Sequence, residues 1–315
     1  MKHLIAIGAG LAALLSAPAF GQQQIDFTKV EIKTTDLGHG LYEMEGAGGN
    51  LAVLTGADGV LMVDTEFAPL AEKIKAAIAK ASDKPLKFVI DTHWHGDHIG
   101  GNEPMAQAGA VLISQENVRL RMAKGQWNAR ANAMTPPAAP GALPSFTYTD
   151  ALTLHLDGET VQVIHAPAAH TDGDSLIYFA GANVLHTGDV YRNTGYPFID
   201  LASGGTLAGT ITAYETILAM IDGKTKIIPG HGPLAKKKDI QASHDMLVLV
   251  RDRVQKLIDQ GKNEDEIVAA APTKDIDKKW TGKGGFVTGE VMVRQTYESI
   301  KGILPPTAPA SKPSN

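Results

Sequence analysis

The sequence predicts a mixed α/β fold that forms one large globular domain. Apolar residues make up 43% and charged residues 20% of the 315 residues, a balance that supplies a sizeable hydrophobic core. The length lies within the range of a single large α/β domain. Strand patterns and helix patterns alternate along most of the chain, which is the arrangement from which the fold class follows.

The first half of the chain begins with strands and continues with alternating helices and strands. Short apolar runs are bounded by turn residues at 48–49 and 57–59, which predicts a β-meander. Leu70, Ile74 and Ile78 recur at helical spacing on one face, so we expect a helix over 68–81. The strands expected in this half are 41–45, 51–56, 60–65, 86–92 and 110–114.

The second half contains two predicted hairpins and two long helices. The hairpins turn at Asp157-Gly158 and at Gly181-Ala182, residue pairs that are typical of tight turns. The expected elements, in order, are strands 152–157, 161–166, 175–180 and 183–189, a helix at 206–222, a strand at 226–228 and a helix at about 238–260.

Residues 124–150 break this alternation. The segment contains prolines at 136, 137, 140 and 144 and shows no regular period. So long an irregular stretch inside a compact domain is typical of an active-site flap or of a disordered insertion. We favour the flap, because Trp127, Phe146 and Tyr148 are available to contact a ligand.

The two ends of the chain have the composition of segments outside the fold. A basic start precedes an apolar run over 4–15 and then small residues, which is the layout of a signal peptide over residues 1–21. We expect cleavage after Ala19 or Gly21 and a periplasmic or secreted mature protein. A membrane anchor is the disfavoured alternative, because a spanning helix needs ~20 apolar residues. Residues 304–315 are rich in Pro, Ala and Ser and predict a flexible tail.

Charge and cysteine content narrow the function. The chain has 29 basic and 34 acidic residues, a net charge of −5, and no basic run longer than Lys236-Lys237-Lys238. These features argue against nucleic acid as a partner and leave a small-molecule substrate. The chain contains no cysteine, so any metal ion must be bound by histidine, aspartate and glutamate.

Residues 91–101 read DTHWHGDHIGG and carry four metal-ligating side chains directly after a predicted buried strand. Extended backbone puts side chains two residues apart on one face, so His93 and His95 can point at one metal ion. Asp97 and His98 then turn into a helix and can bind a second ion beside it. Neutral imidazoles and a carboxylate are ligands that suit Zn²⁺.

Three further residues lie in loops or at strand ends, where α/β sheets place their binding sites. His170 lies in AHTDGDS, Asp189 ends the strand segment HTGD, and His231 lies in PGHG after the strand 226–228. A single loop histidine is more often structural. The three together support one another as additional ligands.

These motifs resemble those of the metallo-β-lactamase superfamily over about residues 25–260. The resemblance implies a four-layer αββα sandwich, and we place the hydrolase domain at 25–303. It also implies two zinc ions per chain. By motif, the first zinc would be bound by His93, His95 and His170, and the second by Asp97, His98 and His231, with Asp189 bridging the two.

Asp64 matches an acidic residue that the family has at the end of an early strand. The resemblance implies that it is not a ligand but a carboxylate that orients the histidine loop. That role is physically reasonable, because a ligand imidazole needs an acceptor for its other N–H group.

The resemblance implies hydrolysis. Zinc lowers the pKa of bound water to about 7, and the resulting hydroxide would attack the carbonyl carbon of a small ester, lactone, thioester or cyclic amide. Asp97 would orient this hydroxide and pass a proton to the leaving group.

The substrate is left open among several classes. Most metallo-β-lactamases have Cys or Ser at the position of Asp189, whereas a bridging Asp is typical of the superfamily's hydroxyacylglutathione hydrolases, lactonases and phosphodiesterases. Two alternatives to a zinc hydrolase stay open: a single-iron sulfur dioxygenase of the same fold, and a non-catalytic periplasmic zinc-binding partner protein. We favour the enzyme, because binding alone does not call for an open two-metal site.

Arg192 is a candidate substrate contact. It follows Asp189 by three residues, the spacing at which some β-lactamases place a lysine that binds the substrate carboxylate, and arginine would bind it bidentately. The alternative is a surface arginine. We expect the loop 191–205 and Trp127 to provide an aromatic rim for an apolar part of the substrate. The remaining histidines, His186 included, are expected to pack or to support the site without being ligands.

Overall fold

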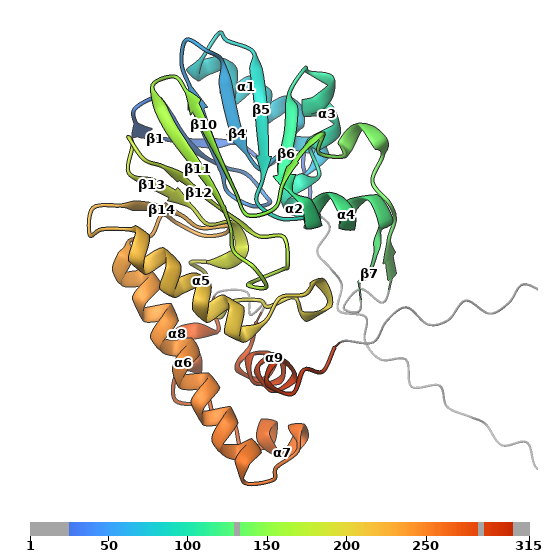
Figure 1. Ribbon diagram of the computed structural model, residues 1–315, viewed down its shortest axis with the longest axis vertical. Helices are drawn as coiled ribbons and strands as arrows, with labels where there is room; N and C mark the ends of the chain where they lie inside the picture. The colour runs from blue at the N-terminus through green and yellow to red at the C-terminus, as the bar shows by residue number, and fades with distance from the viewer. Residues whose placement is uncertain (1–24, 129–132, 283–286, 305–315) are drawn as a thin grey trace, which may run out of the picture.

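Two β-sheets packed face to face form the centre of the structure, and helices cover both outer faces (Figure 1). The computed structural model describes residues 25–128, 133–282 and 287–304. Side chains from both sheets, such as Leu61 and Phe179, meet in one buried cluster between them. The layers are therefore helix, sheet, sheet and helix, which confirms the expected αββα sandwich.

The first sheet has seven strands in the order β1-β2-β3-β4-β5-β6-β9. Strands β1 to β4 are antiparallel neighbours, and β4, β5, β6 and β9 are parallel. The strands are β1 (Lys33–Gly38), β2 (Leu41–Glu45), β3 (Leu51–Thr55), β4 (Val60–Val63), β5 (Leu86–Asp91), β6 (Val111–Gln115) and β9 (Phe146–Tyr148). Helices α1 (Ala71–Ala81) and α3 (Asn102–Gln107) pack on its outer face.

The second sheet has five strands, antiparallel except for the last pair, which is parallel. They are β10 (Ala151–Leu156), β11 (Glu159–His165), β12 (Ser175–Phe179), β13 (Val184–His186) and β14 (Lys226–Ile228). On its outer side lies a helical layer that shares one buried cluster with it. This layer consists of α5 (Leu207–Met220), α6 (Lys237–Asp259), α8 (Asp277–Trp280), α9 (Gly289–Lys301) and α7 (Glu264–Ala269), which packs against α6 and α9.

Shorter elements lie at the edge where the candidate ligands gather. They are α2 (Gly96–Ile99), α4 (Glu116–Lys124), the hairpin β7 (Gln126–Asn128) and β8 (Ala133–Thr135), and the 3₁₀ turns η1 (Ala68–Leu70), η2 (Pro140–Ala142), η3 (Gly188–Val190) and η4 (Leu201–Ser203). None of the helices in the described part of the chain is long and apolar enough to cross a bilayer. The predicted signal peptide and residues 305–315 of the predicted tail lie outside the described residues.

Burial on both faces explains the apolar strands of the first sheet. In β4, Val60 and Met62 pack against the helix layer, while Leu61 and Val63 pack between the sheets. A strand covered on both faces reads as a continuous apolar run rather than as an alternating one. The strands and helices expected from the sequence are present to within a few residues. The elements β1, α3, α4, β9 and the helices beyond 260 were not predicted.

Residues 124–150 contain more regular structure than the flap that the sequence predicts. Strands β7 and β8 pair as a hairpin, and β9 joins the edge of the first sheet beside β6. Tyr148 is buried, with its hydroxyl 2.5 Å from Ser175 Oγ, and Phe146 is exposed on the edge strand. Tyr148 packs in the cluster between the sheets, so the expectation that it contacts a ligand is wrong, whereas the same expectation for the exposed Phe146 stays a prediction.

The inter-sheet core gives a stability prediction. Phe179 on β12 is fully buried between the sheets, so Phe179→Ala should lower the free energy of unfolding by about 3–5 kcal/mol. Thr153→Ala, at an exposed position of β10, should change it by less than about 1 kcal/mol. Denaturant titration of the two variants measures both values, and equal midpoints would contradict the packing described here.

Candidate metal centre

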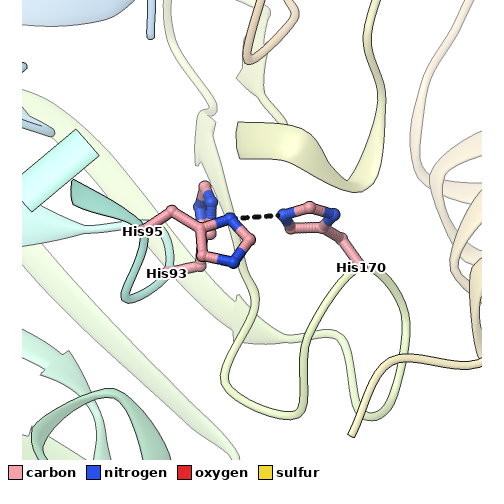
Figure 2. A group of neighbouring side chains, drawn as sticks. All are labelled: His93, His95 and His170. Carbon is pink, nitrogen blue, oxygen red and sulfur yellow. Dashed lines mark hydrogen bonds between the residues drawn. The ribbon is translucent and has the colours of Figure 1, made fainter. Parts of the chain in front are cut away.

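The loops at one edge of the sandwich bring three histidines together. His93 and His95 follow β5, and His170 lies in the loop before β12. Figure 2 shows their imidazole rings directed toward one another, with His170 Nε2 2.9 Å from His95 Nδ1. One nitrogen from each ring lies within 4.8 Å of the others. The structure thus gathers the three residues expected to bind the first zinc.

A second group of donors lies beside the first. Asp97 and His98 come from α2, and His231 comes from the loop after β14. His98 Nε2 lies 3.3 Å from His231 Nε2, which in turn lies 3.3 Å from Asp97 Oδ2. These are the three residues expected to bind the second zinc.

Asp189 lies between the two groups. Its Oδ1 atom is 3.3 Å from His231 Nε2 and 3.5 Å from His98 Nε2. Its Oδ2 atom is 3.9 Å from His170 Nε2. One carboxylate oxygen therefore faces each group, which is the arrangement that a bridging ligand requires.

Acceptors outside the cluster fix which nitrogen of each ring carries the proton. His170 Nδ1 lies 2.7 Å from the Phe198 carbonyl oxygen, and His95 Nε2 lies 2.9 Å from Asp200 Oδ2. Both oxygens can only accept, so these two nitrogens donate. When both rings are neutral, His95 Nδ1 and His170 Nε2 present lone pairs to each other at 2.9 Å. Two facing lone pairs repel unless a cation lies between them.

His93 follows the same pattern. Thr92 Oγ1 donates to Asp64 Oδ2 at 2.8 Å, so it accepts from His93 Nδ1 at 3.0 Å. His93 Nε2 is then a buried lone pair with no hydrogen-bond partner among the described residues. Five imidazoles and two carboxylates arranged in this way fit zinc, which takes nitrogen and oxygen ligands.

Asp64 contacts the histidine loop as the resemblance implied. It is buried with φ +62°, and its carboxylate accepts from the Thr92 backbone N–H at 2.7 Å. Its Oδ2 atom lies 2.7 Å from His98 Nδ1, which leaves His98 Nε2 directed at the cluster. A positive φ is strained for a residue with a side chain, and strain of this kind is concentrated at functional sites.

Two supporting contacts were not predicted from the sequence. Asp200 and the Phe198 carbonyl lie in the loop 191–205, which the sequence suggested only as an aromatic rim. Nothing in the spacing of these residues indicates that the loop folds back onto both His95 and His170. The only indication in the sequence is that Asp200, an acidic residue, lies in the loop that follows Asp189.

Asn50 and His186 hold the loops of the second group. The Asn50 side-chain amide donates to the carbonyls of Pro229 and Gly232 at 2.9 and 2.8 Å, on either side of His231. His186 Nε2 lies 2.9 Å from the Asn50 carbonyl, and its Nδ1 accepts from Gly188 N at 3.1 Å. His186 is thus a supporting residue, as expected, and not part of the donor groups.

Charges in the metal-free chain differ between the two groups. Burial lowers the pKa of His93 and lowers that of His170 to about 4, so both rings are neutral. Burial opposes the charged form of His231 too, but Asp189 and Asp97 outweigh it and raise its pKa to about 9. The pKa of His98 is also raised, because Asp64 and Asp97 overcome the effect of burial. The pKa values of Asp97 and Asp189 are lowered by His98 and His231 despite their burial.

A cavity of about 690 Å³ opens onto the cluster. His95, Asp97, Asp189 and His231 line one end of it. Arg192 lies there too, with Nε 3.8 Å from Asp189 Oδ2 and its side chain only 13% exposed, so it is not a surface arginine.

The hairpin β7–β8 lines the cavity through Gln126 and Thr135, whereas the side chain of Trp127 lies outside the described residues. The apolar wall consists of Trp94, Ile99, Met122, Phe198, Leu201 and Val291.

Comparison with known proteins agrees with this geometry. The family model described as Metallo-beta-lactamase superfamily matches residues 45–233, more than half of the chain. The chain belongs to the metallo-β-lactamase superfamily. A solved superfamily structure, the metallo-β-lactamase from Pontibacter korlensis, shares the fold with a TM-score of 0.58 at 17% identity, covering 69% of this chain and 99% of that one.

Two curated relatives are hydrolases. The linear primary-alkylsulfatase of Pseudomonas sp. is 23% identical over 304 residues, which covers 81% of this chain and 57% of that protein. The hydroxyacylglutathione hydrolase of Rhodobacter capsulatus is 29% identical over 180 residues, which covers 56% of this chain and 59% of that protein. The chain therefore spans less than two thirds of either relative. Its superfamily membership indicates a hydrolase or a related enzyme.

The charge difference between the groups gives a prediction about zinc binding. The pKa of His231 is raised to about 9, so this ring is protonated near neutral pH, and a ligand imidazole must lose that proton. Calorimetry in two buffers of different ionisation enthalpy should therefore show release of about one proton or more per chain. Since the pKa of His231 is about 9, the proton that His231 releases on zinc binding should no longer be observed once the pH has risen above about 9. His231→Asn should release about one proton fewer, and zinc uptake without any proton release would contradict these assignments.

Proposed function

We propose that the protein is an exported, zinc-dependent hydrolase of small anionic esters or related carbonyl compounds that carry an apolar group. The observation that carries this proposal is Asp189, whose two carboxylate oxygens face two separate groups of donors at the end of a cavity. Support for export comes from the signal-peptide pattern of residues 1–21.

The chain's own residues supply most of the arrangement that hydrolysis needs. Zinc in the two donor groups would lower the pKa of a water molecule to about 7 and polarise the bond under attack. Asp97 is the carboxylate best placed to orient that water, because its side chain is 33% exposed to the cavity while one oxygen stays 3.3 Å from His231. We assign to the Asp97 carboxylate the transfer of a proton to the leaving group.

The cavity supports a substrate with one polar and one apolar part. Arg192 lies at the end that the donors line, where a guanidinium can bind a carboxylate or another anion bidentately. The apolar wall around Met122 and Val291 then faces the remainder of the substrate. Most of the surface exposed to the cavity is apolar, as is typical of small-molecule sites, and charged side chains such as Arg121 and Arg294 also line it. The first candidates are carbonyl compounds: esters, lactones, thioesters and cyclic amides, β-lactams included.

A second candidate is hydrolysis of an alkyl sulfate. The alkylsulfatase relative covers 81% of this chain, more than the hydroxyacylglutathione hydrolase does. A sulfate monoester also matches the cavity chemistry, because its charged head would lie near Arg192 and its chain along the apolar wall. The carbonyl and sulfate candidates differ in the bond that is cleaved, so a substrate panel separates them.

Metal analysis and a substrate panel test the proposal. Purified chain should contain two zinc ions and hydrolyse at least one of nitrocefin, a lactone, a thioester, an aryl ester or a medium-chain alkyl sulfate. Asp97→Asn should reduce kcat by about 10²–10⁴-fold if it acts in proton transfer. A single iron would favour the sulfur dioxygenase alternative. Two zinc ions with no turnover of any class would favour a binding protein, and either result would contradict the proposal.

Arg192 gives a prediction about substrate charge. Arg192→Ala should raise KM for an anionic substrate by about 10–100-fold, because a charge-assisted hydrogen bond is lost. A neutral ester analogue should show a change of less than about threefold, and Arg192→Lys should retain part of the effect. Zinc content must stay at the wild-type value, since Arg192 lies next to Asp189. An equal change in KM for charged and neutral substrates would refute a role in anion binding.

A further inference from the structure

One short segment, Pro197–Asp200, supports two ligands of the first donor group at once. We call this segment the strap. The Phe198 carbonyl accepts from His170 Nδ1 at 2.7 Å, and Asp200 Oδ2 accepts from His95 Nε2 at 2.9 Å. The Asp200 backbone N–H also donates to the His170 carbonyl at 2.9 Å. The strap therefore decides which nitrogen of His95 and of His170 is left with a lone pair directed into the cluster.

The Asp200 carboxylate is held by Ser203, whose backbone N–H and hydroxyl donate to its Oδ1 and Oδ2 atoms. The rest of the strap, which carries the Phe198 carbonyl, is the part whose support remains to be found. It contains no helix or strand, so its backbone position depends on what packs against it. Outer contacts of this kind set the orientation and basicity of ligand imidazoles. The question is then which part of the molecule fixes the strap.

Gln295 on α9 is hydrogen-bonded to the strap on both sides of Phe198. Its Nε2 donates to the Pro197 carbonyl at 2.8 Å, and its Oε1 accepts from the Ile199 N–H at 3.3 Å. The side chain is 5% exposed, so water competes little for these bonds. A primary amide carries its donor and its acceptor on two separate atoms, which suits a backbone carbonyl and N–H two residues apart.

The residues before the strap are held by the neighbouring helix. The Tyr196 N–H donates to the Trp280 carbonyl at 2.5 Å, and the Tyr196 hydroxyl donates to Asp277 Oδ1 at 2.9 Å. Both partners belong to α8. Helices α8 and α9 lie beyond residue 233, where the superfamily match ends. The contacts thus run from an added helical segment to the strap and from the strap to two ligands.

We propose that Gln295 is a positioning residue for the first metal site. By fixing the strap through the carbonyl of Pro197 and the N–H of Ile199, it holds His95 and His170 in the tautomers that present Nδ1 and Nε2 to the metal. This inference rests on the metal centre of the proposed function but not on the reaction that the enzyme catalyses. It assigns to α9 a part in metal binding as well as in lining the cavity.

Zinc affinity of the full chain tests this inference without any activity assay. Metal-free protein is titrated with zinc in competition with a chromophoric chelator, which yields two stepwise affinities. Gln295→Leu, close to isosteric but without the amide, should weaken one of them about tenfold, at the low end of the 10–100-fold that outer contacts contribute. Asp200→Asn should weaken the same affinity, which identifies it as the site of His95 and His170.

Two further variants keep the test decisive. Gln295→Glu retains the acceptor for the Ile199 N–H but places a carboxylate against the Pro197 carbonyl, so it should also weaken that site, and it carries the test if Gln295→Leu does not fold. Thr296→Val is the matched control. Thr296 is the next residue on α9, is fully buried, and its hydroxyl has no hydrogen-bond partner in the described part of the chain. It should leave both affinities within twofold of wild type.

The outcomes separate this inference from the proposed function. Unchanged zinc affinities in both Gln295 variants would overturn the inference. An equal loss of affinity at both zinc sites, or an equal loss in Thr296→Val, would also overturn it, because either result would indicate general destabilisation. Wild-type protein that binds fewer than two zinc ions would overturn the proposed function and the inference together. Wild-type protein that binds two ions but hydrolyses no substrate would affect the proposed function alone.

Discussion

The candidate metal centre depends on buried imidazole nitrogens whose lone pairs face one another. His95 Nδ1 and His170 Nε2 lie 2.9 Å apart, and His93 Nε2 is buried beside them without a partner among the described residues. In water each nitrogen would accept a hydrogen bond, so its burial is unfavourable unless something positive lies between the rings. Every surrounding contact keeps these lone pairs inward: the strap accepts from the outer nitrogens of His95 and His170, and Thr92 accepts from that of His93. The donor groups are therefore arranged in a way that could hold a cation.

The backbone around the cluster shows what this arrangement costs. Asp64 and Glu66 both have positive φ, a conformation that costs of the order of 1–3 kcal/mol for residues with a side chain. Close approach adds a second constraint. A Cβ atom on Gly230 would lie 2.1 Å from Asp189 Oδ1, so only glycine fits beside the bridging carboxylate. The loops on the sheet edge are therefore shaped by the cluster, and the sandwich beneath them supplies the stability that offsets the strain.

The sequence predicted the residues of the cluster because their chemistry is local. Two-residue spacing after a buried strand predicted that His93 and His95 point at one site, and the structure brings their donor atoms together there, although β5 ends before them at Asp91. The alternation of strand and helix patterns predicted the α/β class, and the resemblance to the superfamily implied the αββα layers that the structure has. The role of the strap could not be predicted from the sequence. Its function arises from a carbonyl oxygen and from an acidic side chain 105 residues away from His95, and backbone carbonyls carry no sequence signal. Tyr148 was misplaced for a related reason: a three-residue strand at a sheet edge is too short to show a period.

Different parts of the chain provide the candidate ligands and one wall of the cavity, which bears on substrate selection. The ligands and Asp64 lie within residues 45–233, the part that matches the superfamily, and that part alone does not distinguish the chemistries of its members. One wall of the cavity comes instead from α9, where Val291, Arg294, Gln295 and Glu298 recur at helical spacing and so share a face. Gln295 belongs to this wall and also contacts the strap. The same helix therefore lines the cavity and, through Gln295, contacts the segment that supports His95 and His170.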